Sequence, residues 1–193
     1  MSASRTLFQS AHFRLNDSFG ISRLDNGASE TNQDTRMMGH SYGAELLLRR
    51  SMTRHLGGII AYTLSRSERF VGRVEGPSTF DRTHVLNVAL TYDLGRRWRL
   101  GARLMTYSGI PADVAYLAAA RNPPRTEPFW RLDWRLEKRW LIGTDGAWWA
   151  FAAEVLNTTL NPEQMEKSCN AYRCQARELG PITLPSLGVE ARF

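Results

Sequence analysis

Acidic, basic and hydroxyl side chains stand close together in the segment PSTFDRTH, residues 77–84. Asp81 and His84 could work as an acid–base pair, and Ser78 or Thr83 could be the nucleophile that such a base activates. On an extended strand, however, Asp81 and Thr83 point to one face while His84 points to the other. The spacing therefore favours a network of hydrogen bonds at the rim of a strand, and we expect no catalytic residues and no enzymatic activity.

Cys169 and Cys174 are the only cysteines of the chain, and four residues separate them in a polar segment. Two cysteines in a loop suit a small disulfide in an oxidising compartment, and the alternative is two free thiols. A zinc site would need two further ligands that the neighbourhood does not offer. His12, His40 and His55 are scattered and show no ligand spacing. We therefore expect a Cys169–Cys174 disulfide outside the cell, and neither a metal nor a cofactor.

Charged residues occupy alternate positions in several apolar segments, most clearly in FWRLDWRLEKRW, residues 129–140. A helix would scatter these charges around its surface, whereas a strand places them on one face and the tryptophans and leucines on the other. Opposite charges on adjacent strands can pair across a sheet, so we expect a solvated, self-paired wall. The residues expected on this charged wall are Glu45, Arg49, Arg99, Arg103, Arg131, Asp133, Arg135, Glu137, Arg139, Glu154, Glu190 and Arg192.

The same alternation recurs along the chain and predicts about eight strands. These are residues 4–15, 41–50, 56–68, 80–93, 98–107, 129–140, 147–157 and 185–193. Each is near the length of about 9–11 residues that crosses a bilayer at a tilt. We therefore expect one domain over residues 1–193, with an all-β, antiparallel, up-and-down fold.

The predicted connections alternate between short and long. The short ones are SMTRH, DLGRR and IGTDG, and the long ones are residues 16–39, 69–79, 108–128 and 158–180. Outer-membrane barrels sort their connections in this way, with short turns on the periplasmic side. Tyr92, Trp98, Trp140 and Trp149 flank the short turns, where an aromatic girdle belongs. The pattern predicts a transmembrane β-barrel segment.

Composition and charge limit the classes of protein to which the chain could belong. The chain has 193 residues, a net charge of +6 and a mean hydropathy of −0.38, without the run of about 18 apolar residues that a transmembrane helix needs. The start, MSASRTLFQS, has no apolar core, so we expect no signal peptide. The positive charge comes from arginines that alternate with apolar residues rather than from one basic patch, so we expect no nucleic-acid partner.

Several segments, in order, resemble the C-terminal part of TonB-dependent outer-membrane receptors. They are SYGAELLLRR, AYTLSRSER, FDRTHVLNVALTYDLGRRWRLGAR, SGIPAD, LDWRLEKRW, EVLN and GVEARF. The resemblance runs from about Tyr42 to the end, and terminal Phe193 resembles the signal that the barrel assembly machinery reads. It implies a place in the bacterial outer membrane, contact with outer-membrane lipid, and uptake of a scarce ligand of the siderophore, vitamin or sugar class.

Such receptors are, by resemblance, 22-stranded barrels with an N-terminal plug and energy supplied through TonB. We expect this chain to have no plug domain, so plug and TonB would be partners only in a full-length receptor, where the charged wall would face the plug or the ligand path. Alone, it is expected to form an open or strained curved sheet without transport activity. The alternatives are a self-contained eight-stranded outer-membrane barrel, structural or lipid-modifying, and a soluble β-domain that binds a ligand or partner.

The strand register gives a prediction for each face. Trp134 and Arg135 must lie on opposite sides of the sheet. With Trp134, the lipid-facing set comprises Leu90, Leu100, Leu136, Val189 and Phe193. With Arg135, the opposite set comprises Asn87, Arg103, Glu137 and Glu190.

Overall fold

The chain is all-β in a computed structural model, which describes residues 10–23, 36–71, 74–114, 122–143, 146–170 and 172–193. The long strands are β1 (Ser10–Arg23), β2 (Arg36–Thr53), β3 (Leu56–Val71), β5 (His84–Gly95), β6 (Trp98–Tyr107), β8 (Phe129–Ile142), β9 (Ala147–Leu156) and β12 (Leu184–Arg192). The short strands are β4 (Val74–Pro77), β7 (Asp113–Val114), β10 (Glu163–Cys169) and β11 (Cys174–Leu179). None of the described residues forms a helix that is long and apolar enough to cross a membrane.

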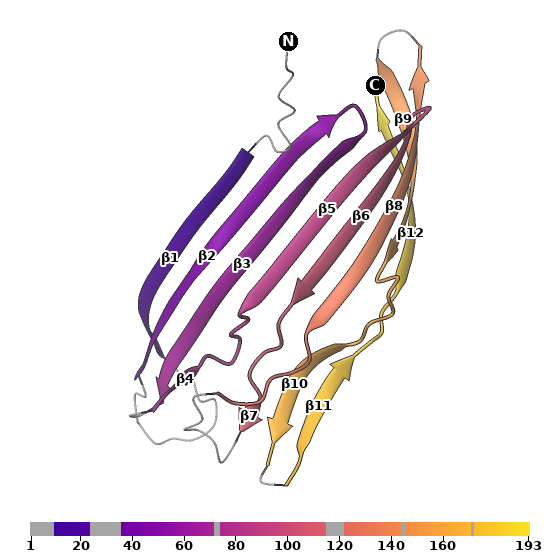
Figure 1. The fold of residues 1–193 in the computed structure, drawn as a ribbon. Coiled ribbons are helices and arrows are strands. Elements are labelled where there is room, and N and C mark those ends of the chain that lie inside the picture. Colours follow the sequence, from indigo (N-terminus) through magenta and orange to yellow (C-terminus); the bar gives the residue numbers. More distant parts are fainter. Residues whose placement is uncertain (1–9, 24–35, 72–73, 115–121, 144–145, 171) are drawn as a thin grey trace.

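The long strands form one curved antiparallel sheet in the order β1-β2-β3-β5-β6-β8-β9-β12, and β4 pairs with β3 (Figure 1). Each long strand pairs with the next long strand of the chain, as the alternating pattern predicts. Within the described residues no pairing joins β1 to β12, so the sheet stays open and both strands are edges. The predicted all-β, open curved sheet is therefore confirmed. A second, three-stranded sheet has the order β11-β10-β7.

Short and long connections lie at opposite ends of the large sheet. At one end, two-residue turns at residues 54–55 and 96–97 join β2 to β3 and β5 to β6. The end of β8, the start of β9 and the end of β12 lie there too (Figure 1). We call this the short-turn end. At the other, long-loop end, the connections carry β4, β7 and the β10–β11 hairpin.

The register fixes which side chains share a face, because residues directly opposite each other on neighbouring strands point the same way. Trp134 lies opposite Ala102 on one side and Val155 on the other. Its neighbour Arg135 lies opposite Gly101 and Glu154. The two faces therefore separate as predicted. We call the face of Trp134 the apolar face and that of Arg135 the charged face.

Exposure differs between the two faces. On the apolar face Trp134 is 40% exposed and Leu136 is 39% exposed. On the charged face Ala150, Ala152 and Asp133 are buried. Most of the exposed tryptophan and leucine side chains therefore lie on the apolar face, although Leu47, Ile59 and Leu141 are exposed on the charged face. In a sheet surrounded by water the opposite distribution would be expected.

Several predicted boundaries are wrong, and the largest differences lie in two places. Residues 16–39 are not a single loop, because β1 continues to Arg23 and β2 already begins at Arg36. These extensions pair with each other over their whole length through the backbone, which needs no apolar alternation. The strand expected from residue 80 begins at His84, because Asp81 packs into the loops instead. Residues 4–9 of the expected first strand lie outside the described residues.

Candidate functional site

All twelve residues expected on the charged wall lie on the charged face. In the strand register, Arg103 lies opposite Asp133, Arg99 lies opposite Glu137, and Arg135 lies opposite Glu154. The other members follow by the two-residue period of their strands: Glu45, Arg49, Arg131, Arg139, Glu190 and Arg192. Trp148 is the one large aromatic residue on this face of β9. The guanidinium carbon of Arg139 lies over its ring, 3.9 Å from the ring centroid.

Arg135 is the centre of an ion-pair network that links three strands. Its Nη2 lies 2.7 Å from Oε1 of Glu190 on β12 and 3.2 Å from Oε2 of Glu137 on β8. Its Nη1 contacts Glu154 on β9. Glu137 in turn pairs with Arg139 at 3.1 Å. One guanidinium thus links the three strands nearest the C-terminal edge.

The rest of the wall is less paired. Arg131 Nε lies 3.0 Å from Oδ1 of Asp133. Five members make no ion pair within the described part of the chain: Glu45, Arg49, Arg99, Arg103 and Arg192. Four of these five are arginines. The ion pairs of the wall therefore lie on β8, β9 and β12, where Arg192 is the one member without an ion pair within the described residues, and the members on β2 and β6 offer mostly positive charge.

Asp81 is the most enclosed polar residue at the long-loop end, with 2% of its surface exposed. Its Oδ2 lies 2.5 Å from Nη2 of Arg125, and its Oδ1 accepts the backbone N–H of Ser67 at 2.7 Å. Arg125 Nη1 also donates to the carbonyl oxygens of Asp81 and Gly109, at 2.9 and 3.0 Å. This is the rim network expected from the sequence, and it fastens two long connections to the end of β3.

His84 lies apart from this network. Its Nδ1 is 2.8 Å from the hydroxyl of Tyr62, and the two rings are stacked with centroids 6.2 Å apart. Ser78 is buried, and its backbone N–H is bonded to Ser67 O at 2.8 Å. Asp81 and His84 therefore have separate partners, and the structure does not bring the sequence's acid–base candidates together.

Gly109, of the SGIP segment, sits where only glycine fits. A Cβ at this position would lie 1.8 Å from the carbonyl oxygen of Thr126. The close approach lets Thr126 Oγ1 accept the N–H of Ile110 at 2.9 Å. Both Ile110 and Thr126 are buried, so the two ends of the β6–β8 connection are packed against each other.

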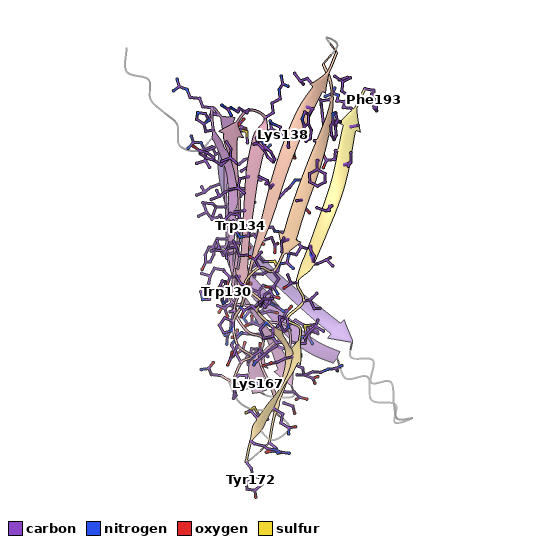
Figure 2. All side chains as sticks on the ribbon, turned by 90° about the vertical axis from the view of Figure 1, so that its right-hand side faces the viewer. Trp130, Trp134, Lys138, Lys167, Tyr172 and Phe193 are labelled. Atoms are coloured by element: carbon purple, nitrogen blue, oxygen red, sulfur yellow. A yellow bond between two sulfur atoms is a disulfide. The ribbon has the colours of Figure 1, made fainter. Side chains whose placement is uncertain are left out.

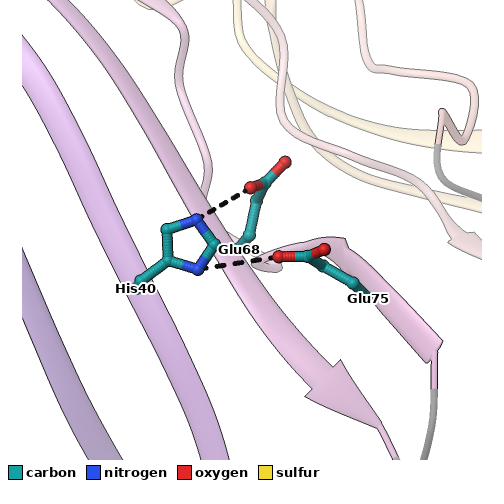
Figure 3. Close-up of side chains that lie close together, drawn as sticks. All are labelled: His40, Glu68 and Glu75. Carbon is teal, nitrogen blue, oxygen red and sulfur yellow. Dashed lines mark ion pairs between the residues drawn. The ribbon is translucent and has the colours of Figure 1, made fainter.

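A cluster of His40, Glu68 and Glu75 was missed by the sequence analysis, which treated His40 as isolated (Figure 3). Nε2 of His40 lies 3.2 Å from Glu68 Oε2, and Nδ1 lies 3.6 Å from Glu75 Oε1. Their donor atoms lie within 4.8 Å of one another, a set that could hold a divalent cation. Glu68 also pairs with Arg66 at 3.0 Å, so a cation would compete with that guanidinium. Only the pairing of β2, β3 and β4 brings these residues together.

Aromatic residues gather on the apolar face at the short-turn end. The rings of Trp140 and Trp149 are stacked, with centroids 4.2 Å apart. Lys138 Nζ lies 5.0 Å from the centroid of Trp98 and donates to the Arg96 carbonyl oxygen at 2.7 Å. Figure 2 places Lys138 near this end and Trp134 farther along the sheet. The group forms a belt at one level of one face, as the aromatic positions in the sequence predict.

The two remaining sequence-predicted features lie at opposite ends of the molecule. Cys169 and Cys174 are bonded to each other and close the β10–β11 hairpin. Figure 2 shows Tyr172 at the tip of this hairpin, beyond the long-loop end. Phe193 lies at the short-turn end and is 96% exposed. An exposed terminal aromatic side chain is accessible to a partner.

No family model, curated protein or solved structure matches the chain. The arrangement of the described residues is therefore the basis for assigning a role. It comprises an outward apolar face with an aromatic belt, a charged face with surplus arginine, and two open edges.

Proposed function

We propose that the chain is the C-terminal part of the barrel wall of a TonB-dependent receptor, which takes up a scarce ligand such as a siderophore, vitamin or sugar across the bacterial outer membrane. One observation carries this proposal: eight long antiparallel strands form a single open sheet with an exposed apolar face and a charged face. In such a barrel the apolar face lies against lipid and the charged face lines the lumen. The ordered sequence resemblance to these receptors supports the same reading.

The open edges favour a wall over a self-contained barrel. In hydrocarbon each unpaired backbone N–H or C=O costs several kcal/mol, so a lipid-embedded sheet is strongly destabilised when β1 and β12 stay unpaired. Neighbouring strands of a larger barrel would pair with both edges. On this proposal the sheet alone does not transport, because it is not a closed wall.

The charge distribution on the wall suits an acidic partner in the lumen. Arg49, Arg99, Arg103 and Arg192 have no acidic partner among the described residues. Carboxylates of a plug domain or of a ligand could pair with them. The proposal assigns no catalytic role, because Asp81 is engaged by Arg125 and lies apart from His84.

The experiment is to express residues 1–193 behind a signal peptide in a Gram-negative host and to analyse the membrane fraction. We expect membrane association without a heat-modifiable band, because the sheet does not close, and no conductance in planar bilayers. A matched chain with Trp134→Arg and Leu136→Arg should leave the membrane fraction, since arginine on the lipid face costs about 2–4 kcal/mol at the midplane.

Two results would count against the proposal. A heat-modifiable, protease-resistant monomer with pore conductance would favour the self-contained eight-stranded barrel. A chain that stays in the aqueous fraction and folds there would favour a β-domain that works in water.

A further inference from the structure

A cavity of about 340 Å³ lies at the short-turn end, between the β2–β3 turn, the β5–β6 turn and the charged face. Five arginines line it: Arg54, Arg96, Arg97, Arg99 and Arg139. They come from two turns and from β6 and β8, so residues far apart in the sequence converge here. Strand alternation alone does not predict this convergence, because it depends on how the turns fold back over the sheet.

The charge in this cavity is strongly unbalanced. Asp93 is the one carboxylate among the described residues that line it, and its Oδ1 already accepts the Gly95 N–H at 2.8 Å. Arg139 is paired with Glu137. The other four arginines make no ion pair within the described part of the chain. Arg54, Arg96 and Arg97 are exposed, and the combined positive charge of the lining would attract an anion.

The β5–β6 turn keeps two of these arginines in an unfavourable backbone conformation. Arg96 and Arg97 have φ of 50° and 65°, and they are the two central residues of a two-residue hairpin turn. Such turns favour Asn-Gly, because positive φ is strained for a residue with a long side chain. Arg54 in the β2–β3 turn also has a positive φ, of 54°. Strain retained at three arginines around one cavity points to a use for their side chains.

We propose that this cavity binds a phosphate group, carried either by a small solute or by a phospholipid head group. The guanidinium fork matches phosphate oxygens with two parallel hydrogen bonds, which an isolated chloride ion cannot use. The site goes beyond the proposed function and does not depend on it, because phosphate recognition requires only the cavity and its arginines.

The test uses the full chain refolded in dodecyl maltoside, a detergent without phosphate. Isothermal titration with inorganic phosphate, against chloride at equal ionic strength, measures binding. The key variant is Arg96→Asn with Arg97→Gly, which removes two charges but installs the residues that the turn prefers. The stacked pair Trp140–Trp149 provides the folding check, since its coupled circular-dichroism signal requires the native contact.

We expect saturable phosphate binding by the native chain and binding at least tenfold weaker in the turn variant. The control is Arg173→Gln with Arg177→Gln, which removes the same charge from the exposed β10–β11 hairpin and should change the affinity less than twofold. Equal binding by the turn variant and the native chain would overturn the proposal. So would an absence of saturable binding in native chain that keeps the tryptophan signal.

A second arm distinguishes the source of the phosphate. Flotation with phosphatidylcholine vesicles is compared with and without phosphatidylglycerol, in the absence of free phosphate. Phosphatidylcholine carries a phosphate whose charge is balanced by choline, so a phosphatidylglycerol-dependent gain that the turn variant loses assigns the site to the head group of an anionic phospholipid. Saturable binding of inorganic phosphate without a phosphatidylglycerol-dependent gain in flotation assigns the site to a phosphate-bearing solute. If the turn variant and the native chain show the same phosphate affinity and the same flotation with phosphatidylglycerol, the proposed site does not exist.

Discussion

At the scale of single residues, a few charged side chains tie the sheet to its loops. Asp81 illustrates this, because it is bonded to Arg125, which lies 44 positions later in the sequence. The contact joins two long connections at the long-loop end. Alternation could predict the faces of Trp134 and Arg135, since a strand's geometry fixes them locally. It could not predict the partner of Asp81 or the cluster around His40, because those contacts depend on where long loops return to the sheet.

Asp81→Asn should destabilise the fold while preserving the size of the side chain. Arg125 would be left without its carboxylate, and removing one partner of a buried ion pair costs about 3 kcal/mol. The free energy of unfolding in urea, measured in detergent micelles, gives the comparison. Asp113→Asn is the control, because Asp113 is exposed and makes no ion pair within the described residues. Equal stability of the two variants would show that the rim network does not stabilise the fold.

At the scale of elements, the sequence predicted the bounds of strands that have one apolar face, and it did not predict strands in which neither face is apolar. β6 has the predicted bounds, and β8 differs only by two added residues at its end. The extensions of β1 and β2 were missed because their polar sequence, NDSFGISR in β1, carries no alternation. β4, β7, β10 and β11 were missed for a related reason: they are short and pair within long connections.

The disulfide should stabilise the β10–β11 hairpin and leave the large sheet unaffected. Replacing Cys169 and Cys174 with serine removes a covalent constraint worth about 2 kcal/mol for so small a loop. Amide exchange in β10 and β11 should become roughly thirtyfold faster, and exchange in β8 should not change because it belongs to another sheet. Unchanged exchange in the hairpin would contradict this.

Mass spectrometry of membrane-derived protein without reduction should show no free thiols, and two free thiols would count against both the bond and its extracellular placement.

At the scale of the whole molecule, the two faces of the sheet suit different surroundings. The open sheet presents exposed tryptophan and leucine on one side, and arginine with its acidic partners on the other. If the sheet is the wall of a larger barrel, the apolar face touches lipid along its whole middle section and the charged face touches water. A β-domain that works in water would instead cover the apolar face with protein.

The measurement that tests this most directly is a fluorophore scan along β8 in lipid vesicles. Single cysteines replace residues 131 to 138 one at a time, in chain with Cys169 and Cys174 changed to serine, and each is labelled with bimane. Lipid-borne nitroxide should quench the labels at Leu132, Trp134 and Leu136, and water-soluble quencher should reach those at Asp133, Arg135 and Glu137. Quenching without this two-residue period, or lipid contact at the charged positions, would contradict the account.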